Sequence, residues 1–262
     1  MDNLMGYNVL SLFDGLSCGQ IALQKSNIKV NKYFASEIDS YAIDVAKENY
    51  PSMIQLGNVK DVKAERVGDI DLLIGGSPCQ GFSYANSGQE LNFDDPRSQL
   101  FFEYVRLKRE LKPKYFLLEN VSMKKESLDI ISKYLGVQPI LINSDRFVQQ
   151  NRKRYYWTNI PIAELPDRPS WQGDFYRYRN RNWRHIKTGV TPCLTAHMGT
   201  GGNNVPCKSM NLSDKLTAEE CESLQGIPQG YTEKVSRSQR YKMIGNSWTV
   251  PVISHILKGI TQ

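Results

Sequence analysis

A cysteine and a glutamate are the residues of this 262-residue chain best suited to covalent chemistry. Cys79 lies in "GGSPCQGFSYANSG", residues 75–88, whereas a buried structural cysteine is expected within an apolar run. Glu119 lies in "KYFLLEN", residues 114–120, where a carboxylate bonded to backbone amides is the alternative interpretation. A thiolate can add to an electrophilic carbon while a nearby acid protonates the heteroatom that receives the electrons. The pair therefore predicts covalent catalysis if the fold brings the two side chains together.

Short apolar runs separated by helical segments must position these two residues. Buried strands are predicted at residues 7–13, 31–37, 69–76, 114–120 and 137–143. "SYAIDVAKENY" and "SQLFFEYVRLKREL" have helical spacing, and each ends just before a proline. The alternation predicts an α/β fold, with a parallel sheet, helices on both faces and ligands beyond the carboxyl ends of the strands. Cys79 and Glu119 each follow or end a predicted strand, so they could meet at that edge.

Composition limits the class of protein. The apolar content of 40% suits one sizeable core, which excludes a disordered chain or a disulfide miniprotein. Five cysteines without a C-x-x-C pair or a signal peptide predict reduced thiols in a soluble cytoplasmic protein, and no apolar run reaches the roughly 18 residues of a membrane span. Lys and Arg exceed Asp and Glu by 33 to 27, which permits a polyanionic partner without requiring one.

A glycine-containing turn and an acid suggest a ligand that bears adenosine. "FDGLSCG" follows the first predicted strand, and Gly15 and Gly19 permit a tight turn and close approach of a ligand. The turn lacks the G-x-G-x-x-G of nicotinamide enzymes and alone is weak evidence. Glu37 ends the second predicted strand, about where a carboxylate would accept hydrogen bonds from a ribose. A surface or helix-capping carboxylate is the alternative interpretation.

The basic excess is concentrated in "RPSWQGDFYRYRNRNWRHIK", residues 168–187. This stretch contains five arginines, one lysine and five aromatic residues, and Asp174 is its only acid. Aromatic residues interleaved with arginine favour nucleic-acid contact over the alternative of a solvated loop. Arg177, Arg179 and Arg181 are the predicted nucleic-acid-binding residues.

Four motifs, in order, resemble those of the DNA cytosine-5 methyltransferases: "GGSPCQGFS", "LLENV", "QQNRKRYYW" and "YKMIGNSWTVPV". The match covers nearly the whole chain, with residues 160–190 as the main gap. "SLFDGLSCG" and "GNSWTVPVI" also resemble the animal de novo DNA methyltransferases, although this chain has no room for their regulatory domains. The resemblance implies a Rossmann-like, S-adenosylmethionine-dependent methyltransferase sheet with a small target-recognition lobe.

The resemblance also implies the chemistry. Cys79 would attack C6 of a cytosine while Glu119 contacts N3, and C5 would then take the methyl group of S-adenosylmethionine. Loss of the C5 proton and elimination of Cys79 would release 5-methylcytosine and S-adenosylhomocysteine. Arg152 and Arg154 align with paired arginines that hold the extruded base and a neighbouring phosphate, acceptors that suit a guanidinium fork. A solvated basic strand end is the alternative, which their spacing on one strand face disfavours.

The cofactor residues implied by the resemblance come from four segments. Ser17 stands where the family commonly has a further glycine, and Asn58 where it often has aspartate. Asn58 could still accept from the adenine amino group through its side-chain oxygen. Phe13 would stack on adenine, with simple core packing as the alternative. The full set is Phe13, Asp14, Gly15, Leu16, Ser17, Glu37, Ile38, Asn58, Asn246, Ser247 and Trp248.

Three regions are implied. Residues 1–159 would be the catalytic and cofactor-binding domain, 160–216 the small target-recognition domain, and 217–262 a bracing helix and a return to the catalytic domain. Double-stranded DNA would lie between the lobes, with residues 80–96 as a lid over a cytosine that must leave the base stack. We expect a monomer in the cytoplasm of a bacterial or phage-infected cell, with any cognate restriction endonuclease acting separately.

Two other functions remain open. An RNA cytosine-5 methyltransferase could share the fold, but the Cys-Phe-Thr signature of the tRNA-directed branch is absent. A noncatalytic DNA-binding relative would be expected to lack Cys79 or Glu119. No metal is predicted, because Cys193, His197 and Cys207 form no compact ligand pairs, even with His185.

Overall fold

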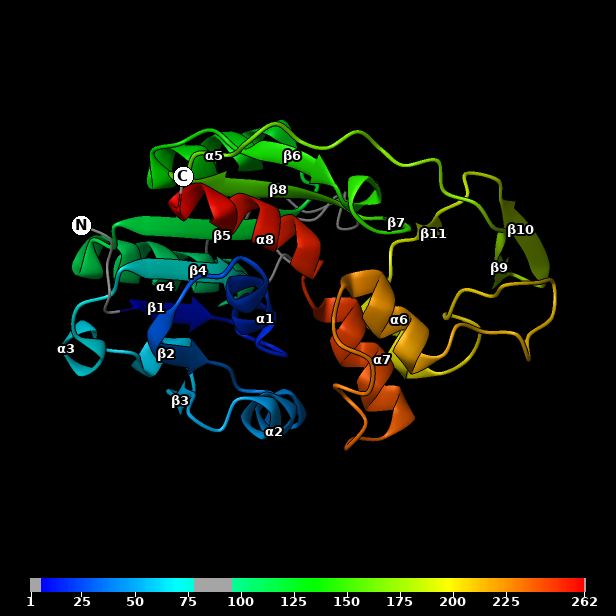
Figure 1. The fold of residues 1–262 in the computed structure, drawn as a ribbon, viewed down its shortest axis with the longest axis horizontal. Coiled ribbons are helices and arrows are strands. Elements are labelled where there is room, and N and C mark those ends of the chain that lie inside the picture. The colour runs from blue at the N-terminus through cyan, green and yellow to red at the C-terminus, as the bar shows by residue number, and fades with distance from the viewer. Residues whose placement is uncertain (1–5, 78–95, 262) are drawn as a thin grey trace.

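The computed structural model describes residues 6–77 and 96–261. Cys79 and residues 80–95 of the expected lid lie outside these ranges. Figure 1 shows a sheet with helices around it and a second group of elements beyond one end of the strands.

The central feature is a seven-stranded sheet in the order β3-β2-β1-β4-β5-β8-β6. All neighbours pair in parallel except β8, which runs antiparallel to both β5 and β6. The strands are β1 (Tyr7–Leu12), β2 (Val30–Ser36), β3 (Ile54–Gln55), β4 (Leu72–Gly76), β5 (Tyr115–Val121), β6 (Ile140–Asn143) and β8 (Lys153–Thr158).

The direction of β8 departs from the expected parallel sheet. The chain between β6 and β8 holds only the short helix η3 (Ser144–Arg146) and the two-residue strand β7 (Gln150–Asn151). A parallel crossover needs about a dozen residues or more, usually with a helix, so this connection allows only an antiparallel return. The reversal brings the start of β8, with Arg154, beside the end of β5.

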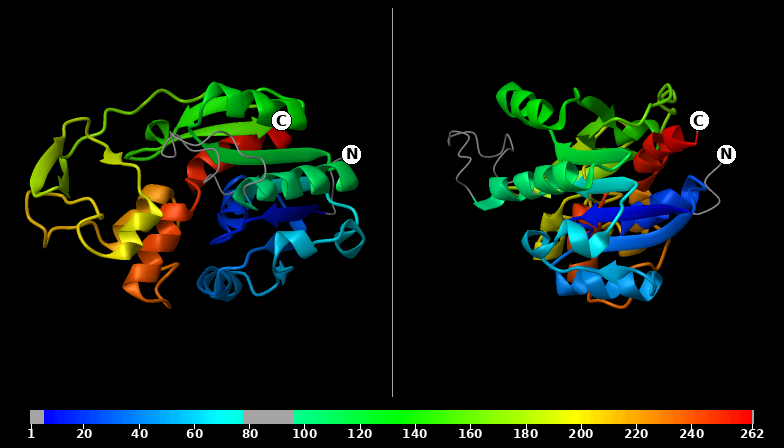
Figure 2. Two further views of the ribbon diagram at one scale, coloured as in Figure 1. Left: turned by 180° about the vertical axis from the view of Figure 1, so that it is seen from behind. Right: turned by 90° about the vertical axis from the view of Figure 1, so that its left-hand side faces the viewer.

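Helices cover both faces of the sheet (Figure 2). Alternate strand residues enter different cores, as the pleat requires: Val9 packs with α1, α2 and α8, whereas Leu10 packs with α4 and α5. Both side chains are fully buried, as expected for a central parallel strand. These helices are α1 (Cys18–Lys25), α2 (Ser40–Asn49), α4 (Pro96–Leu111), α5 (Lys125–Leu135) and α8 (Val250–Leu257), with the short η1 (Val59–Asp61) and α3 (Ala64–Val67) after β3.

The second group of elements follows β8 and includes a two-stranded hairpin, seen on the right of Figure 1. Its members are β9 (Phe175–Arg179), β10 (Asn182–Ile186), β11 (Thr191–Pro192), η4 (Ala196–Thr200), α6 (Ala218–Gln225) and α7 (Arg237–Asn246). β11 pairs with β7, which ties this group to the strand region that precedes β8. The chain then returns through α8 and η5 (Lys258–Ile260), and α8 packs on α1. The domain boundaries near residues 160 and 216 stay predictions.

Candidate active site

Glu119 and Arg154 form an ion pair at the end of the sheet. They lie on the antiparallel neighbours β5 and β8, and the Glu119 Oε1 to Arg154 Nε distance is 2.9 Å. The side chains are only 11% and 14% exposed, respectively. Burial alone would lower the pKa of Arg154, but the Glu119 carboxylate, with smaller contributions from Cys193 and Tyr156, more than offsets burial and the pKa is raised. Arg154 therefore remains charged and holds the Glu119 carboxylate in one orientation.

Gly76, the last residue of β4, makes room for two predicted site residues. A Cβ at this position would lie 2.7 Å from Trp248 Nε1 and 3.1 Å from Glu119 Oε2. Only a residue without a side chain fits there, so the predicted catalytic acid and a predicted cofactor residue share the space at the end of β4. Asn120 Nδ2 donates to Ser77 Oγ at 3.1 Å and holds the last described residue before the segment that contains Cys79.

Arg152 occupies a different environment from Arg154. Its side chain is buried, and Nη1 donates to Leu194 O at 2.8 Å and to Gly245 O at 3.2 Å, while Nη2 donates to Ser247 O at 2.9 Å. Burial, followed by the nearby Arg154, lowers the pKa of Arg152. The guanidinium therefore joins the chain before β8 to the end of α7, and a base-holding role for it stays a prediction.

Two glutamines complete a buried polar cluster around Arg152. Gln150 and Gln225 are fully buried, and Gln150 Nε2 donates to Gln225 Oε1 at 3.1 Å. Gln150 Oε1 accepts from Leu194 N at 2.9 Å, and Gln225 Nε2 donates to Ile244 O at 3.0 Å. We call Gln150, Arg152 and Gln225 the junction network. Sequence reasoning missed both glutamines, because nothing local distinguishes a buried glutamine from an exposed one.

Cys193 is a second residue that sequence reasoning did not place here. Its Sγ lies 3.4 Å from Arg152 Nη1 and 3.9 Å from Arg154 Nη2. Burial would raise the pKa of this thiol, but the two guanidinium groups more than offset burial and the pKa is lowered. The available signal was its position in "TPCL", directly after the basic stretch.

The predicted cofactor loop has an unusual backbone. Phe13, Gly15 and Ser17 have φ angles of 58°, 54° and 55°, in the left-handed region that only glycine adopts freely. The surrounding groups hold this conformation: Asp14 accepts from Ser17 Oγ and, at 2.7 Å, from the Tyr33 hydroxyl. Strain held by its surroundings is common at functional sites. Ser17 thus has the conformation suited to the glycine that the family commonly places there.

Asp14 has a perturbed acidity. Burial raises its pKa to about 6, the hydrogen bonds from Ser11, Ser17 and Tyr33 partly offset the rise, and the Glu37 carboxylate adds to it. A carboxyl group with a pKa raised this far is typical of functional sites.

Glu37 links the ends of β1 and β2. Its Oε2 accepts from Gly15 N at 2.8 Å, and its Oε1 accepts from Ile38 N at 2.7 Å and Asp39 N at 2.9 Å. The carboxylate therefore orders the cofactor loop, and ribose binding stays a prediction. Beside it, the apolar side chain of Ile38 is 74% exposed, and its role in cofactor binding stays a prediction.

Asn58 follows the short strand β3 by three residues and caps η1. Its Oδ1 accepts from Lys60 N at 3.1 Å, and the residue is exposed. The contact uses one lone pair of the oxygen that was expected to serve adenine.

The carboxyl end of α7 meets the cofactor loop. Burial raises the pKa of Cys18 to about 12, with lesser effects that include hydrogen bonds with the Trp248 backbone and the Ser247 side chain. Leu16 is buried, and its carbonyl oxygen accepts from the Tyr231 hydroxyl at 2.8 Å. Asn246, the last residue of α7, is exposed. The fold thus brings together the predicted cofactor residues of the two ends of the sequence.

The three predicted DNA-binding arginines have different positions. Arg177 is half-buried and its Nη2 donates to Cys193 O at 3.4 Å, whereas Arg179 and Arg181 are exposed. Arg177 therefore connects the hairpin to the group formed by Cys193, Arg154 and Glu119.

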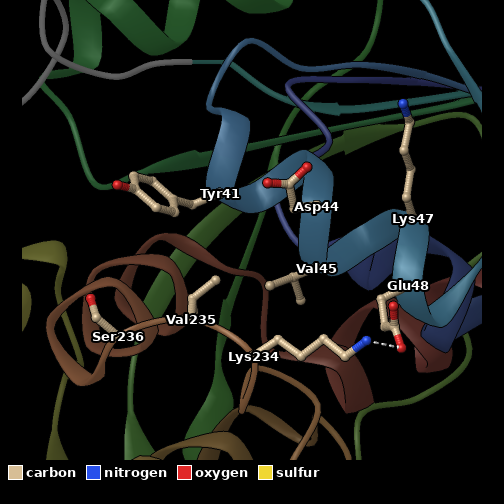
Figure 3. Close-up of a pocket in the computed structure, with 8 residues that line it drawn as sticks. All are labelled: Tyr41, Asp44, Val45, Lys47, Glu48, Lys234, Val235 and Ser236. Carbon is tan, nitrogen blue, oxygen red and sulfur yellow. Dashed lines mark ion pairs between the residues drawn. The ribbon is translucent and has the colours of Figure 1, made fainter.

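A pocket of about 640 Å³ lies between α2 and residues 234–236 (Figure 3). It is lined by charged residues, two of which, Lys234 and Glu48, pair with each other. None of the predicted site residues lines it. Within residues 6–77 and 96–261, no cluster of three or more His, Cys, Asp or Glu side chains could hold a metal ion. No helix in the same ranges has the length and apolar character needed to cross a membrane.

The chain matches known proteins over nearly its whole length. Residues 7–161 and 166–262 match the family model "C-5 cytosine-specific DNA methylase". The chain is 28% identical to the type II methyltransferase M.Bsp6I of Bacillus sp. (strain RFL6), over 96% of this chain and 98% of that protein. It is 35% identical to the orphan methyltransferase M.SPRI of Bacillus phage SPR, over 64% of this chain and 41% of that protein. The fold is similar to that of a putative DNA modification methyltransferase from an E. coli prophage, with a TM-score of 0.73, 22% identity and coverage of 97% and 98% of the two chains.

Proposed function

The chain belongs to the C-5 cytosine-specific DNA methylase family and methylates cytosine in DNA at C5; we propose that it does so through a covalent adduct between Cys79 and C6 of a flipped-out cytosine. The observation that best supports this mechanism is the buried Glu119–Arg154 pair at the end of the sheet, next to Trp248. The acid and the predicted cofactor site meet at this point.

Glu119 neutralises the negative charge that develops on the cytosine ring. When the Cys79 thiolate forms its bond to C6, an electron pair moves through the ring toward N3, which takes a proton from the Glu119 carboxyl group. Because Arg154 orients the carboxyl group, little reorganisation is needed as the charge develops. C5 then takes the methyl carbon, whose bond to the sulfonium sulfur of the donor breaks in the same step and leaves a neutral thioether. A base removes the C5 proton, N3 returns its proton to Glu119, and the C6–sulfur bond breaks to restore the thiolate and the aromatic ring.

S-adenosylmethionine is the proposed methyl donor, and it supplies an electrophilic methyl carbon. The chain offers a fitting site: a strained loop at residues 13–17, the exposed apolar Ile38, and Asn246 at the end of α7. The close approach of a ligand to the loop backbone is what a glycine such as Gly15 permits. Phe13 and Ile38 would cover the adenine, and Glu37 and Asp14 would hold the polar groups of the nucleoside and the amino acid.

We test the mechanism with Cys79→Ser and Glu119→Gln in cells that express the chain. Bisulfite sequencing should show 5-methylcytosine at a fixed DNA motif for the parent and none for Cys79→Ser, while purified Cys79→Ser still binds S-adenosylhomocysteine in calorimetric titration. Cys221→Ala is the matched control, because this buried cysteine lies in α6. Normal turnover by Cys79→Ser would disprove the covalent mechanism, and methylation of RNA in place of DNA would favour the other substrate class.

We further propose that the protein acts as a monomer in the cytoplasm of a bacterial or phage-infected cell, and that any cognate restriction endonuclease acts separately. The similarity to both a type II methyltransferase and an orphan methyltransferase supports a DNA-modifying enzyme without deciding whether a nuclease accompanies it. Light scattering of the purified protein, with and without a DNA duplex, tests the monomer.

A further inference from the structure

The turn of the β9–β10 hairpin contains a strained arginine. Arg179 pairs with Asn182, so only Asn180 and Arg181 form the turn, and their φ angles are 51° and 60°. A two-residue turn with two positive φ angles strongly prefers Asn-Gly, because glycine has no Cβ to clash with the backbone. Arginine at the second position carries a conformational cost, and such strain points to a function for the side chain.

The two faces of this hairpin differ in chemistry. One face carries aromatic side chains that pack on one another: the Tyr178 and Trp183 rings lie 5.0 Å apart, and the Tyr176 and His185 rings stack at 4.7 Å. The cross-strand register places Arg177, Arg179 and Arg184 together on the opposite face. The aromatic face stiffens the hairpin, and the arginine face is left to meet a partner.

The arginine face is oriented toward the candidate active site. Arg177 donates to Cys193 O, and Cys193 Sγ lies beside Arg152 and Arg154. Burial lowers the pKa of Arg177, and the positive charges of Arg179 and Arg184 contribute to the lowering. The row of cations therefore begins next to the predicted base-holding residues and continues toward the turn.

This positive charge has no internal compensation. In the described parts of the chain, no carboxylate pairs with Arg179, Arg181 or Arg184, whereas the acid at the base of the hairpin, Asp174, pairs with His185 at 2.6 Å. Uncompensated arginines on a rigid strand pair fit a polyanion. A two-stranded ribbon has the width of the DNA major groove, where the arginine fork fits the O6 and N7 acceptors of guanine.

We propose that the β9–β10 hairpin enters the major groove beside the target cytosine, that Arg181 at its turn recognises a guanine, and that Arg179 and Arg184 contact phosphates. This assignment rests on the proposed function, and it divides the hairpin arginines into one that selects sequence and two that supply affinity. It requires the methylated motif to contain a G·C pair in addition to the target pair.

The experiment compares Arg181→Gly, Arg181→Lys and Arg184→Gln. Bisulfite sequencing of DNA from cells expressing the parent first defines the motif, and duplexes altered at each G·C pair of that motif then serve as substrates. For Arg181→Gly we expect discrimination at one G·C pair to fall roughly 10- to 100-fold, the value of a bidentate arginine contact. Because glycine removes the strain at φ 60°, this variant should also have a slightly higher Tm than the parent.

Arg181→Lys separates base recognition from charge. Lysine keeps the charge but lacks the planar fork, so discrimination should fall while affinity at low salt is largely kept. Arg184→Gln should weaken binding to all duplexes and lower the slope of log affinity against log salt by about one unit, with unchanged discrimination. Arg66→Ala, a far-side control on the exposed surface of α3, should match the parent.

The outcomes separate this inference from the proposed function. If the parent methylates DNA and Arg181→Gly retains full discrimination at every position, Arg181 does not recognise a base. A motif without a second G·C pair would also overturn the assignment. If the folded parent methylates no DNA, the proposed function itself is wrong. Discrimination between duplexes could then not be measured for any variant, so this outcome differs from a failure of the Arg181 assignment alone.

Discussion

At the scale of single residues, the predicted cofactor site depends on which polar atoms already have hydrogen-bond partners within the protein. Asp14 accepts from Ser17 and Tyr33, Glu37 accepts from three backbone amides, and the Asn58 oxygen accepts from Lys60 N. The atoms that remain free decide what a ligand can bind. The ionisation of Asp14 and the donor or acceptor character of the Asn58 side chain each give a prediction.

The first prediction concerns Asp14 and pH. Its folded-state pKa is raised to about 6 from 3.8, so the ionised form is disfavoured in the native protein, and its contribution to stability declines as pH rises from about 4 to above 6. Ligand binding should have the opposite trend, because S-adenosylmethionine carries one more positive charge than S-adenosylhomocysteine and favours the carboxylate. Calorimetry between pH 5 and 8 should show the affinity for S-adenosylmethionine increasing through pH 6.

Two controls accompany this titration. The affinity for S-adenosylhomocysteine should depend less on pH, and Asp14→Asn should flatten the curve for S-adenosylmethionine. If the parent and Asp14→Asn give parallel curves, then Asp14 is not the titrating group.

The second prediction concerns Asn58. Aspartate at this position would keep the hydrogen bond from Lys60 N and add a free acceptor for the adenine amino group, where asparagine presents a donor. Asn58→Asp should tighten binding of S-adenosylhomocysteine by about 1 kcal/mol, roughly fivefold. Asn58→Ala should instead lose the cap and about 1 kcal/mol of folding stability. Weaker binding by Asn58→Asp in calorimetric titration would show that no adenine donor lies near this residue.

The sequence placed Glu119 in a strand and the predicted cofactor loop directly after one, because the apolar runs of β5 and β1 are local patterns. The roles of these residues stay predictions. The sequence could not predict that Arg152 and Arg154, two residues apart, have different partners. Arg152 donates to the carbonyl groups of Leu194 and Ser247, whereas Arg154 pairs with Glu119. All of these partners are distant in sequence from the two arginines. The position of Cys79 relative to Glu119 stays a prediction.

At the scale of elements, short segments meet at the junction network. Gln150 begins β7, Arg152 follows it, and Gln225 ends α6. The acceptors include the carbonyl groups of Leu194 and Ile244. Buried polar groups are costly unless each has a partner, and a fully satisfied network specifies one arrangement of its elements. The network therefore fixes α6 and α7 relative to β8.

The third prediction tests this role. Gln225→Leu removes four hydrogen bonds, to Gln150, Ile244, Ser247 and Thr249, and leaves their polar groups buried. The free energy of unfolding measured in urea should fall by about 2 to 4 kcal/mol. Gln229→Leu is the control, because Gln229 has one exposed hydrogen bond to Ser223 and should change stability by less than about 0.5 kcal/mol. Equal effects for the two variants would contradict a stabilising network.

The elements themselves were predictable to different degrees. The central strands and α2 and α4 follow from apolar runs and helical spacing before prolines. The expectation of an all-parallel sheet was wrong at β8, which is antiparallel to its neighbours. The direction of this strand is set by the length of the connection before it and not by its own composition. The β9–β10 hairpin was not predicted, because its Asn-Arg turn lacks the glycine by which such turns are usually identified.

At the scale of the whole molecule, the candidate DNA side and the cofactor side share one backbone segment. Residues 245–248 accept hydrogen bonds from Arg152, contact Cys18 at the start of α1 and place Trp248 beside Glu119. Gly245 packs so closely on Thr195 that an added Cβ would lie 2.1 Å from the Thr195 carbonyl carbon. A ligand bound against residues 246–248 would therefore lie next to the segment around Thr195, which follows the β9–β10 hairpin in the chain.

The last prediction separates Arg152 from Arg154 on this basis. Arg154→Ala removes the partner of Glu119, so single-turnover methylation should slow at least tenfold while S-adenosylhomocysteine binds with parental affinity. Arg152→Ala leaves the carbonyl groups of Leu194, Gly245 and Ser247 without their buried donor. It should therefore lower the free energy of unfolding by about 3 kcal/mol and weaken cofactor binding as well as methylation. Urea unfolding, calorimetry and single-turnover assays on identical duplexes measure all three effects. If Arg152→Ala loses only methylation rate, its guanidinium serves the flipped base alone, and the two lobes are joined by other contacts.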